Sequence, residues 1–339
     1  MVQYHGFRRI LDRERSAWLF DLLQNPRCGF RRRFALGFIR LLLRRRQSGR
    51  GRLYLNLGHT GLDQNGLADW IQRTDVRPIY FVHDLIPIAQ PQFCRPGELD
   101  KHRRRMLAVL ETAEAVIGNS QATLDDLASF AAANGRPLPP AIAAWLGSKQ
   151  PNREHHVPGS APVFVVLGTI EARKNHILLL DIWARLVPRL GESAPTLLFI
   201  GQRGWECDDV FDRLETDDRL GGKVVELNEC SDVEAVNYLA GARALLFPSL
   251  AEGFGLPMVE ALAVGTPVIA SDLPVFREIG QGIPDLIDPA KIDEWEEAVV
   301  AYCNPENPRR RAQLDRLINF ALFTWRDHFA AIGPWLAKL

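Results

Sequence analysis

The stretch SLAEGFGLPMVEALAVGTPVIAS, residues 249–271, holds two glutamates around a glycine-rich turn. Glu252 lies in the predicted turn, where its carboxylate can accept hydrogen bonds from hydroxyl groups or stabilise a positive charge. Glu260 lies about one turn inside the predicted helix, where a carboxylate can accept both vicinal hydroxyls of a ribose. The alternative, on these residues alone, is a strand–turn–helix unit with two surface glutamates.

The turn between the two carboxylates also offers backbone donors. Gly253 and Gly255 permit positive φ and a close approach of the backbone to a ligand. The N–H groups of Phe254, Gly255 and Leu256 would then face outward just ahead of a helix, whose dipole attracts anions. These residues would therefore allow the turn to contact a ligand through its backbone.

A second loop, GTIEARKN at 168–175, has the same setting between an apolar run and a helical pattern. Arg173 can bind a phosphate through two donors and Lys174 acts as a point charge, so the pair makes a diphosphate clamp at a helix N-terminus. A solvated basic turn explains this loop equally well when it is taken alone. The two loops together favour one site that holds a sugar, a diphosphate and a ribose in a row.

The elements that must position these loops alternate between strand and helix. Near-continuous apolar runs with helical patterns between them predict a parallel, doubly wound α/β sheet, and ligands bind beyond the carboxyl ends of such strands. Ser231 and Glu234 fit a capping box at the start of one helix. The predicted strands are 162–168, 196–201, 223–227, 244–249 and 267–271, and the predicted helices are 176–187, 231–242 and 257–264.

The N-terminal half repeats this pattern less regularly, with predicted strands at 53–58, 78–82 and 115–120. The polar segment 149–162, rich in Pro and Gly, is the candidate linker. We therefore expect two Rossmann-like domains that face each other across a cleft, residues 1–155 and residues 156–321. The last segment, 322–339, is expected to pack back on the first domain as an amphipathic helix whose Trp325, Phe329, Ile332 and Trp335 cover a surface.

Composition limits the classes of protein. The chain has 339 residues, 47% of them hydrophobic, which supports packed cores. Its five scattered cysteines form no Cys-x-x-Cys pair, which favours a reduced, cytoplasmic protein. The N-terminus is charged where a signal peptide would be apolar, and no apolar run is long enough to span a bilayer.

The net charge of zero hides two opposite halves. Residues 1–150 hold 23 basic and 13 acidic side chains, a net charge of +10, and residues 151–339 balance it at −10. Residues 1–52 hold 14 arginines against three acids, with arginine triplets around FALGFIRLLL. This segment suits an anionic partner such as lipid headgroups, phosphates or nucleic acid. It is explained equally well by a half-buried core helix or by docking on an anionic membrane.

Two segments resemble a known family. LFPSLAEGFGLPMVEALAVGTPVIASDLPVFREI is similar to the E-x7-E signature of retaining family-4 glycosyltransferases with the GT-B fold, and VLGTIEARKNH is similar to their phosphate-binding turn. The resemblance implies transfer of a hexose, such as mannose, from a nucleotide diphosphate sugar with retained anomeric configuration. It implies that Glu252 contacts the donor sugar's hydroxyls and Glu260 the ribose. Arg173 and Lys174 would hold the diphosphate as it leaves.

The phosphate turn departs from the family pattern at one position. Many members carry an arginine directly after the glycine of this turn, whereas here Thr169 follows Gly168. Gly168 and Thr169 would then contact the diphosphate without adding a charge. Arg173 would therefore carry more of the charge stabilisation here than the corresponding residue does in other family members.

YFVHDLIPIAQPQFCRPGE, residues 80–98, resembles the H-D-x-x-P segment of bacterial polysaccharide glycosyltransferases. The resemblance implies that His83, at a strand end, touches the donor sugar or the departing oxygen. Without it, a locally hydrogen-bonded strand-end histidine is the simpler explanation. Asp84 either orients His83 or caps the next turn. The segment GHTGLD, 58–63, either lines the acceptor side or is a plain turn.

No Asp-x-Asp motif for a diphosphate-bound metal occurs, and His155 and His156 lack further ligands around them, so we assign no metal. We expect no cofactor other than a GDP- or UDP-linked sugar as substrate. The expected acceptor is a glycan or a lipid-linked oligosaccharide in surface polysaccharide synthesis, with the enzyme cytoplasmic or peripheral on the inner face of the membrane, and without a nucleic-acid partner. The alternatives are a nucleotide-sugar 2-epimerase and a non-catalytic GT-B protein whose basic arm binds membrane or nucleic acid.

Overall fold

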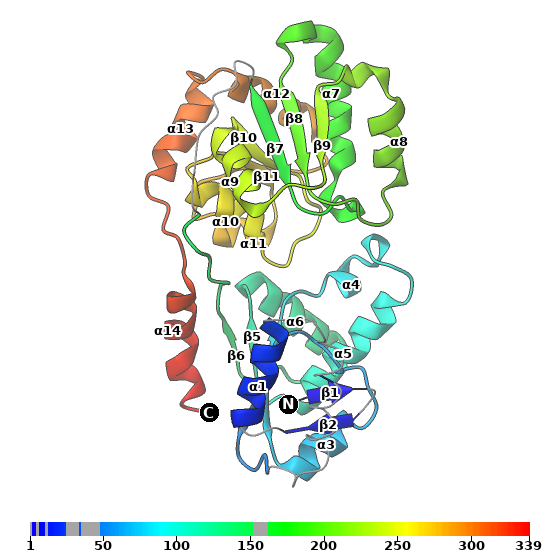
Figure 1. The fold of residues 1–339 in the computed structure, drawn as a ribbon, viewed down its shortest axis with the longest axis vertical. Coiled ribbons are helices and arrows are strands. Elements are labelled where there is room, and N and C mark those ends of the chain that lie inside the picture. The colour runs from blue at the N-terminus through cyan, green and yellow to red at the C-terminus, as the bar shows by residue number, and fades with distance from the viewer. Residues whose placement is uncertain (1, 5–6, 11–12, 25–33, 35–47, 152–161) are drawn as a thin grey trace. The chain divides into compact units, whose positions relative to one another are not determined.

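The computed structural model describes all residues except 1, 5–6, 11–12, 25–33, 35–47 and 152–161 (Figure 1). The described chain divides into two compact units. The first comprises Met1–Val82, Asp100–Ile117 and Ala131–Ala141, and the second comprises His83–Leu99, Gly118–Phe130 and Ile142–Leu339. Most of the predicted linker 149–162, the predicted domain boundary at 155 and the pair His155–His156 lie outside the described residues.

The second unit is built on a six-stranded sheet in the order β12-β11-β10-β7-β8-β9, in which every pair of neighbouring strands is parallel. Because chain order and sheet order differ, β7 and β10 are hydrogen-bonded neighbours although β8 and β9 separate them in sequence. The five predicted strands of this half are confirmed. The strands are β7 (Val163–Leu167), β8 (Thr196–Ile200), β9 (Val224–Leu227), β10 (Ala244–Phe247), β11 (Val268–Ser271) and β12 (Asp285–Ile287).

Helices cover both faces of this sheet (Figure 1). The three predicted helices are confirmed, and Ser231 and Glu234 form the predicted capping box at the start of α9. The α-helices are α7 (His176–Leu190), α8 (Asp208–Thr216), α9 (Asp232–Gly241), α10 (Leu256–Ala263), α11 (Pro274–Ile279), α12 (Ile292–Cys303), α13 (Pro308–Leu317) and α14 (Trp325–Leu336). The 3-10 helices are η1 (Pro91–Phe93), η2 (Ala172–Lys174), η3 (Gly191–Ser193) and η4 (Asp218–Leu220).

Successive strand residues enter two separate cores, because side chains alternate across a sheet. Phe164 and Leu246 join the core that holds Trp183 of α7. Val165 and Leu245, one position away on the same strands, join the core that holds Met258 of α10. The sheet is therefore buried on both faces, which is why its strands are continuous apolar runs.

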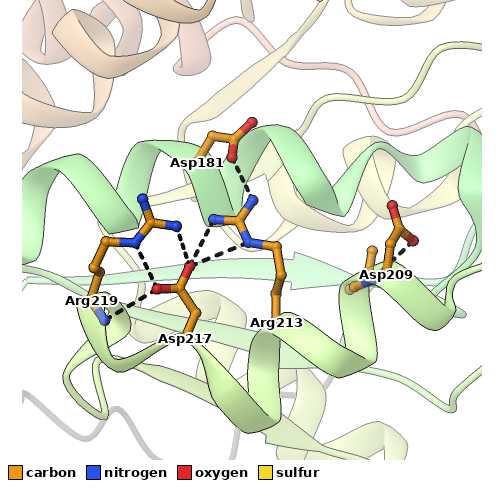
Figure 2. Close-up of polar contacts among 6 residues, drawn as sticks. Asp181, Asp209, Arg213, Asp217 and Arg219 are labelled. Carbon is orange, nitrogen blue, oxygen red and sulfur yellow. Dashed lines mark hydrogen bonds and ion pairs between the residues drawn. The ribbon is translucent and has the colours of Figure 1, made fainter.

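An ion-pair network holds α8 and η4 against α7 (Figure 2). Asp217 accepts from Arg213 at 3.1 Å and from Arg219 at 2.7 Å, and Arg213 also pairs with Asp181 of α7. Hydrogen bonds from Arg219 first, and then from Arg213, lower the pKa of Asp217 to about 2. Asp217 is therefore ionised at neutral pH, and its ion pairs with Arg213 and Arg219 fix the connection between α8 and β9 at the outer edge of the sheet.

The first unit contains most of a four-stranded sheet in the order β3-β4-β5-β6, with β3 parallel to β4. The predicted strands at 53–58, 78–82 and 115–120 are confirmed. The strands are β1 (Val2–Tyr4), β2 (Phe7–Arg9), β3 (Leu53–Asn56), β4 (Arg77–Val82), β5 (Ala115–Gly118) and β6 (Ala141–Ala143). The helices of the N-terminal half are α1 (Arg13–Gln24), α3 (Leu67–Thr74), α4 (Ile86–Ala89), α5 (Glu98–Thr112) and α6 (Gln121–Ala133).

The segment 58–63 was predicted either to line the acceptor side or to be a plain turn. In it, His59 is buried with a φ of 55°, and its ring meets that of His102 edge to face at 5.4 Å.

The run FALGFIRLLL lies outside the described residues except for Phe34, so its core and membrane interpretations stay predictions. Within the described parts of the chain, no helix has the length and apolar character needed to cross a membrane.

The C-terminal helix α14 forms as predicted, with a capping box between Thr324 and Asp327. It is anchored to the segment before the linker, where His328 Nδ1 lies 2.7 Å from the carbonyl oxygen of Trp145. The prediction that its large side chains all cover a surface is wrong. Ile332 is buried, but Trp325 and Phe329 are 43% and 61% exposed, and their rings contact each other and the ring of His328.

Candidate functional site

The two loops predicted to do chemistry lie side by side at the carboxyl edge of the second sheet. The loop after β7 and the loop after β10 are adjacent because these strands are neighbours. Leu250 N donates to the carbonyl of Arg173 at 2.7 Å, and the Arg173 guanidinium donates to the carbonyl of Ala251 at 3.1 Å. Backbone contacts in both directions make one continuous surface of the two loops.

Glu252 is the centre of this surface. Its Oε1 lies 2.5 Å from Lys174 Nζ and 2.8 Å from Arg173 Nη1, and it accepts from Ser249 Oγ at 3.0 Å. Arg173 is shared with Glu171, whose Oε1 lies 2.5 Å from its other terminal nitrogen. Sequence reasoning offered two roles for Glu252, binding of hydroxyl groups or stabilisation of a positive charge, and it missed Glu171. In the structure Glu252 pairs with both cations, and Glu171 pairs with Arg173.

Burial and pairing shift the pKa values of these groups. The Glu252 side chain is 8% exposed; burial alone would raise its pKa, but the charges of Lys174 and Arg173 outweigh this effect and lower it. Burial lowers the pKa of Lys174, and Glu252 offsets only part of that effect. The two carboxylates and two cations form a neutral cluster. Its positive members stay in place only as long as Glu252 is ionised.

The start of α10 supplies backbone donors beside this cluster. Gly255 precedes the helix with a φ of 108°, and Pro257 lies in its first turn. Among the described residues, no group accepts a hydrogen bond from the N–H of Phe254, Gly255 or Leu256. Three free amides at a helix N-terminus form an anion-binding surface.

Glu260 lies one turn further along α10, as predicted from its spacing. No group in the described chain donates a hydrogen bond to its carboxylate. Burial and, to a smaller extent, the charge of Asp232 raise its pKa. A partly desolvated carboxylate without an internal donor is suited to accept hydroxyl groups from a ligand.

The phosphate turn itself is shaped by glycines. Gly168 has a φ of 126°, and Thr169 is exposed directly after it. A Cβ on Gly201, in the neighbouring loop after β8, would lie 2.1 Å from the carbonyl oxygen of Gly168. A Cβ on Gly204 would lie 2.5 Å from the carbonyl oxygen of Ile170. The loop at 201–205 therefore supports the phosphate turn from behind, a role that its paired glycines after a strand could have indicated.

The segment that carries His83 belongs to the same compact unit and contacts the glutamate loop. His83 follows the end of β4, and its side chain is half-buried. The His83 carbonyl oxygen accepts a hydrogen bond from Asn119 Nδ2 at 2.7 Å. A Cβ on Gly253 would lie 2.5 Å from that carbonyl oxygen. Asp84 Oδ1 accepts from Ile86 N at 3.0 Å, which supports the capping role among the two left open for it.

Helix α6 adds residues that sequence reasoning missed. The Ser120 and Thr123 hydroxyls lie 3.4 Å and 3.3 Å from the carbonyl oxygen of Gly253. Glu278 of α11 accepts from the backbone N–H of Gln121 at 2.8 Å and from Trp145 Nε1 at 2.7 Å. These hydrogen bonds fix the start of α6 on the glutamate loop. They join residues far apart in the chain, so local sequence patterns do not reveal them.

We expect Glu278→Ala to lower the free energy of unfolding by about 2–4 kcal/mol, because hydrogen bonds to a carboxylate are strong and the α6 amides lose their cap. Thermal unfolding followed by calorimetry measures the change. Glu294→Ala, which removes an exposed carboxylate paired with Lys291, is the matched control and should change stability by less than about 0.5 kcal/mol. Equal melting temperatures for the two variants would contradict the view that Glu278 holds the start of α6 in place.

His176, the first residue of α7, is a buried group beside the phosphate turn. Neither ring nitrogen has a hydrogen-bond partner within the described chain, and the ring packs edge to face on Phe199 at 4.8 Å. Burial, and then the charge of Lys174, lower its pKa from 6.5 to about 3. The imidazole is therefore neutral in the folded protein at any pH near neutrality.

This pKa makes stability depend on pH. The folded state binds the proton only near pH 3, whereas the unfolded chain binds it near pH 6.5, so stability is lost as the pH falls below 6.5. The loss between pH 6.5 and 5 is about 2 kcal/mol. In urea unfolding, we expect the fall in the free energy of unfolding from pH 7 to pH 5 to be about 2 kcal/mol smaller for His176→Phe than for the wild type. Parallel losses in the two proteins would show that His176 is not buried as neutral imidazole.

Comparison with known proteins agrees with this geometry. Residues 148–313 match the family model for glycosyl transferases group 1. This segment belongs to the group 1 glycosyl transferases. It contains both loops, Glu252, Glu260 and the clamp residue Glu278, so the group 1 segment holds most of the candidate site.

Curated relatives match parts of the chain. It is 29% identical over 223 residues to the serotype-specific mannosyltransferase WbdA of Escherichia coli, a match that covers 60% of this chain and 27% of WbdA. It is 39% identical over 131 residues to the O-antigen chain mannosyltransferase RfbU of Salmonella typhimurium, covering 37% of this chain and 35% of RfbU. The chain thus spans roughly a quarter to a third of the length of these relatives.

Solved structures show the fold. The structure of Anabaena HepE in complex with UDP and glucose has a TM-score of 0.66 at 20% identity, covering 84% of this chain and 78% of HepE. Sucrose-phosphate synthase from Thermosynechococcus elongatus has a TM-score of 0.61 at 19% identity, covering 84% and 73% of the two chains. The predicted α/β class and GT-B fold are confirmed.

Proposed function

We propose that this protein is a retaining glycosyltransferase that moves a hexose, mannose in the first instance, from a nucleotide diphosphate sugar to a glycan or lipid-linked acceptor in surface polysaccharide synthesis. One observation carries the proposal: Arg173 and Lys174 are held by Glu252 directly beside the free amides at the start of α10. The names of the curated mannosyltransferase relatives support the choice of sugar.

The geometry explains how the diphosphate would leave. Negative charge develops on the phosphate as its bond to the sugar breaks, and preorganised donors in a buried site stabilise such charge strongly. Lys174 and Arg173 supply cations, and Leu256 N and its neighbours supply amides. Glu171 and Glu252 already neutralise Arg173 and Lys174. The two cations are therefore held in a buried site at a small cost in free energy before the substrate binds. These groups would take the part that a metal ion plays in other sugar transferases, so we propose no metal and no cofactor.

The rest of the donor follows from the same surface. Glu260 would accept the ribose hydroxyls, with a GDP- or UDP-linked sugar as donor, and HepE was solved with UDP. His83 would lie at the donor sugar, because its segment packs on Gly253. The acceptor hydroxyl would attack on the face from which the diphosphate leaves. A cytoplasmic site, and contact of residues 1–52 with an anionic membrane surface, belong to the same proposal.

We expect Glu260→Ala to weaken the binding of GDP or UDP by about 10- to 100-fold, because two hydrogen bonds to a charged group are lost. Isothermal titration of the full chain measures the dissociation constant. Glu294→Ala, on the exposed surface of α12, is the control and should bind like the wild type. Unchanged affinity in Glu260→Ala would remove the ribose role. Product analysis with the donor alone separates sugar transfer from the 2-epimerase alternative.

A further inference from the structure

Two arginines meet at the amino edge of the second sheet, the edge at which its parallel strands begin. Arg243 directly precedes β10, and Arg310 lies in the first turn of α13, drawn in orange in Figure 1. Arg310 Nε donates to the carbonyl oxygen of Arg243 at 3.4 Å, and both residues are half-buried. Because Glu252 lies in the loop after β10, the arginine pair and the candidate diphosphate site lie at opposite ends of the same strand.

Neither guanidinium group of this pair has an acidic partner in the part of the chain that the structure describes. The other arginines of α13 are paired. Arg309 and Arg316 share Asp285, at 2.6 Å and 2.8 Å. Arg311 pairs with Glu306. The surface at the start of α13 therefore carries two positive charges that no neighbouring carboxylate balances.

These two charges act on each other and on the end of α12. Burial, and then the charge of Arg243, lower the pKa of Arg310, so the two guanidinium groups are close and partly withdrawn from water. Burial raises the pKa of the Cys303 thiol to about 11, and the charge of Arg243 offsets part of that rise. Two like charges held together in partly desolvated surroundings repel each other, and an anion bound between them relieves the repulsion.

We infer that Arg243 and Arg310 form a binding site for a phosphate group, separate from the diphosphate site of the proposed function. Each guanidinium fork can donate two parallel hydrogen bonds to phosphate oxygens, and the anion supplies the charge that the pair lacks. Residues 151–339 carry a net charge of −10, so the half as a whole repels anions and only a local site attracts them. The ligand is a phosphate-bearing solute or a phospholipid headgroup, which present the same group. The inference does not depend on the proposed function, because no residue of that site takes part.

The test follows the Nε–H signals of Arg243 and Arg310 in NMR spectra of the full chain during titration with inorganic phosphate. Chloride keeps the ionic strength constant, because general screening would otherwise shift the signals. The loss of a signal in Arg243→Gln or in Arg310→Gln assigns it. We expect both signals of the wild type to shift to saturation with one shared dissociation constant.

In each single variant, we expect the remaining arginine to need at least about 10-fold more phosphate for half-saturation, because one charge and one bidentate contact are lost. Arg189→Gln is the matched control, since it removes an exposed arginine that pairs with Glu296, and it should leave the dissociation constant unchanged. Signals that do not saturate, signals that saturate with different constants, or unchanged affinity in the single variants would overturn the inference.

A second arm identifies the source of the phosphate group. The wild type and Arg243→Gln/Arg310→Gln are sedimented with vesicles made of equal parts of phosphatidylcholine and phosphatidylglycerol. Binding to the vesicles that is at least about 10-fold weaker in the double variant assigns the site to a lipid headgroup. Equal vesicle binding by the two proteins, together with saturable binding of inorganic phosphate, assigns it to a phosphate-bearing solute.

Discussion

Replacing Lys174 with alanine is expected to lower the rate of sugar transfer by about two to three orders of magnitude. Removal of one preorganised donor to a developing negative charge costs this much in other enzymes. Lys174 Nζ lies 2.5 Å from Glu252 Oε1, and the Lys174 side chain is only 9% exposed, so no solvent cation replaces it. The measurement is kcat for transfer from a nucleotide sugar to a glycan acceptor at saturating donor.

The same change leaves Glu252 with Arg173 as its remaining cation, which costs stability. The double variant Lys174→Met/Glu252→Gln separates the two effects, because it removes both charges of the pair. We expect it to melt close to the wild type and still to transfer sugar slowly. Lys291→Ala, at an exposed ion pair with Glu294, is the control and should keep full activity. Transfer within about threefold of the wild type in Lys174→Ala would exclude Lys174 from the chemistry.

Replacing Gly253 with alanine is expected to lower the rate of sugar transfer by about 100-fold. The free energy of unfolding is expected to fall by about 1–3 kcal/mol. The new Cβ would lie 2.5 Å from the carbonyl oxygen of His83 and 2.9 Å from Asp84 Cβ, so the two segments must move apart. A displacement of about 1 Å at a catalytic group costs rate on this scale, whereas overpacking costs about 1–3 kcal/mol. The pair of measurements is kcat and the free energy of unfolding in urea.

Gly333 in α14 offers the matched control, because a Cβ there meets nothing within 4 Å. Gly333→Ala should leave transfer unchanged and is compatible with a small gain in helix stability. If Gly253→Ala lost stability but kept its transfer rate, the contact between the His83 segment and the glutamate loop would be structural only.

The strands of the second unit were predictable because burial on both faces makes them continuous apolar runs. β10 and β11 are buried at every position, and their bounds differ from the predictions by no more than two residues. β12 was missed, since its three residues Asp285–Ile287 carry an aspartate that Tyr302 and Arg316 bind from other elements. A strand so short and so dependent on distant partners leaves no local pattern.

The loops that form the site were predictable from the sequence, but the ion pairs between these loops were not. Strand–helix alternation places the loops after β7 and β10 at one edge, and the glycines and cations within them indicate a ligand. Only the sheet order brings these loops together, so the ion pairs of Glu252 could not be derived from spacing. The Glu278 clamp and the contact of Thr123 with Gly253 join elements more than a hundred residues apart. Such contacts are decided by tertiary packing.

The central claim is that the Arg173–Lys174–Glu252 cluster and the amides at the start of α10 together bind the diphosphate of a nucleotide sugar. Isothermal titration of the full chain with GDP, GMP, UDP and UMP tests it most directly. The account predicts that one nucleoside diphosphate binds at least about 10-fold more tightly than its monophosphate, and that Lys174→Ala abolishes this difference. Equal affinity for di- and monophosphate, or a difference that persists in Lys174→Ala, would contradict it.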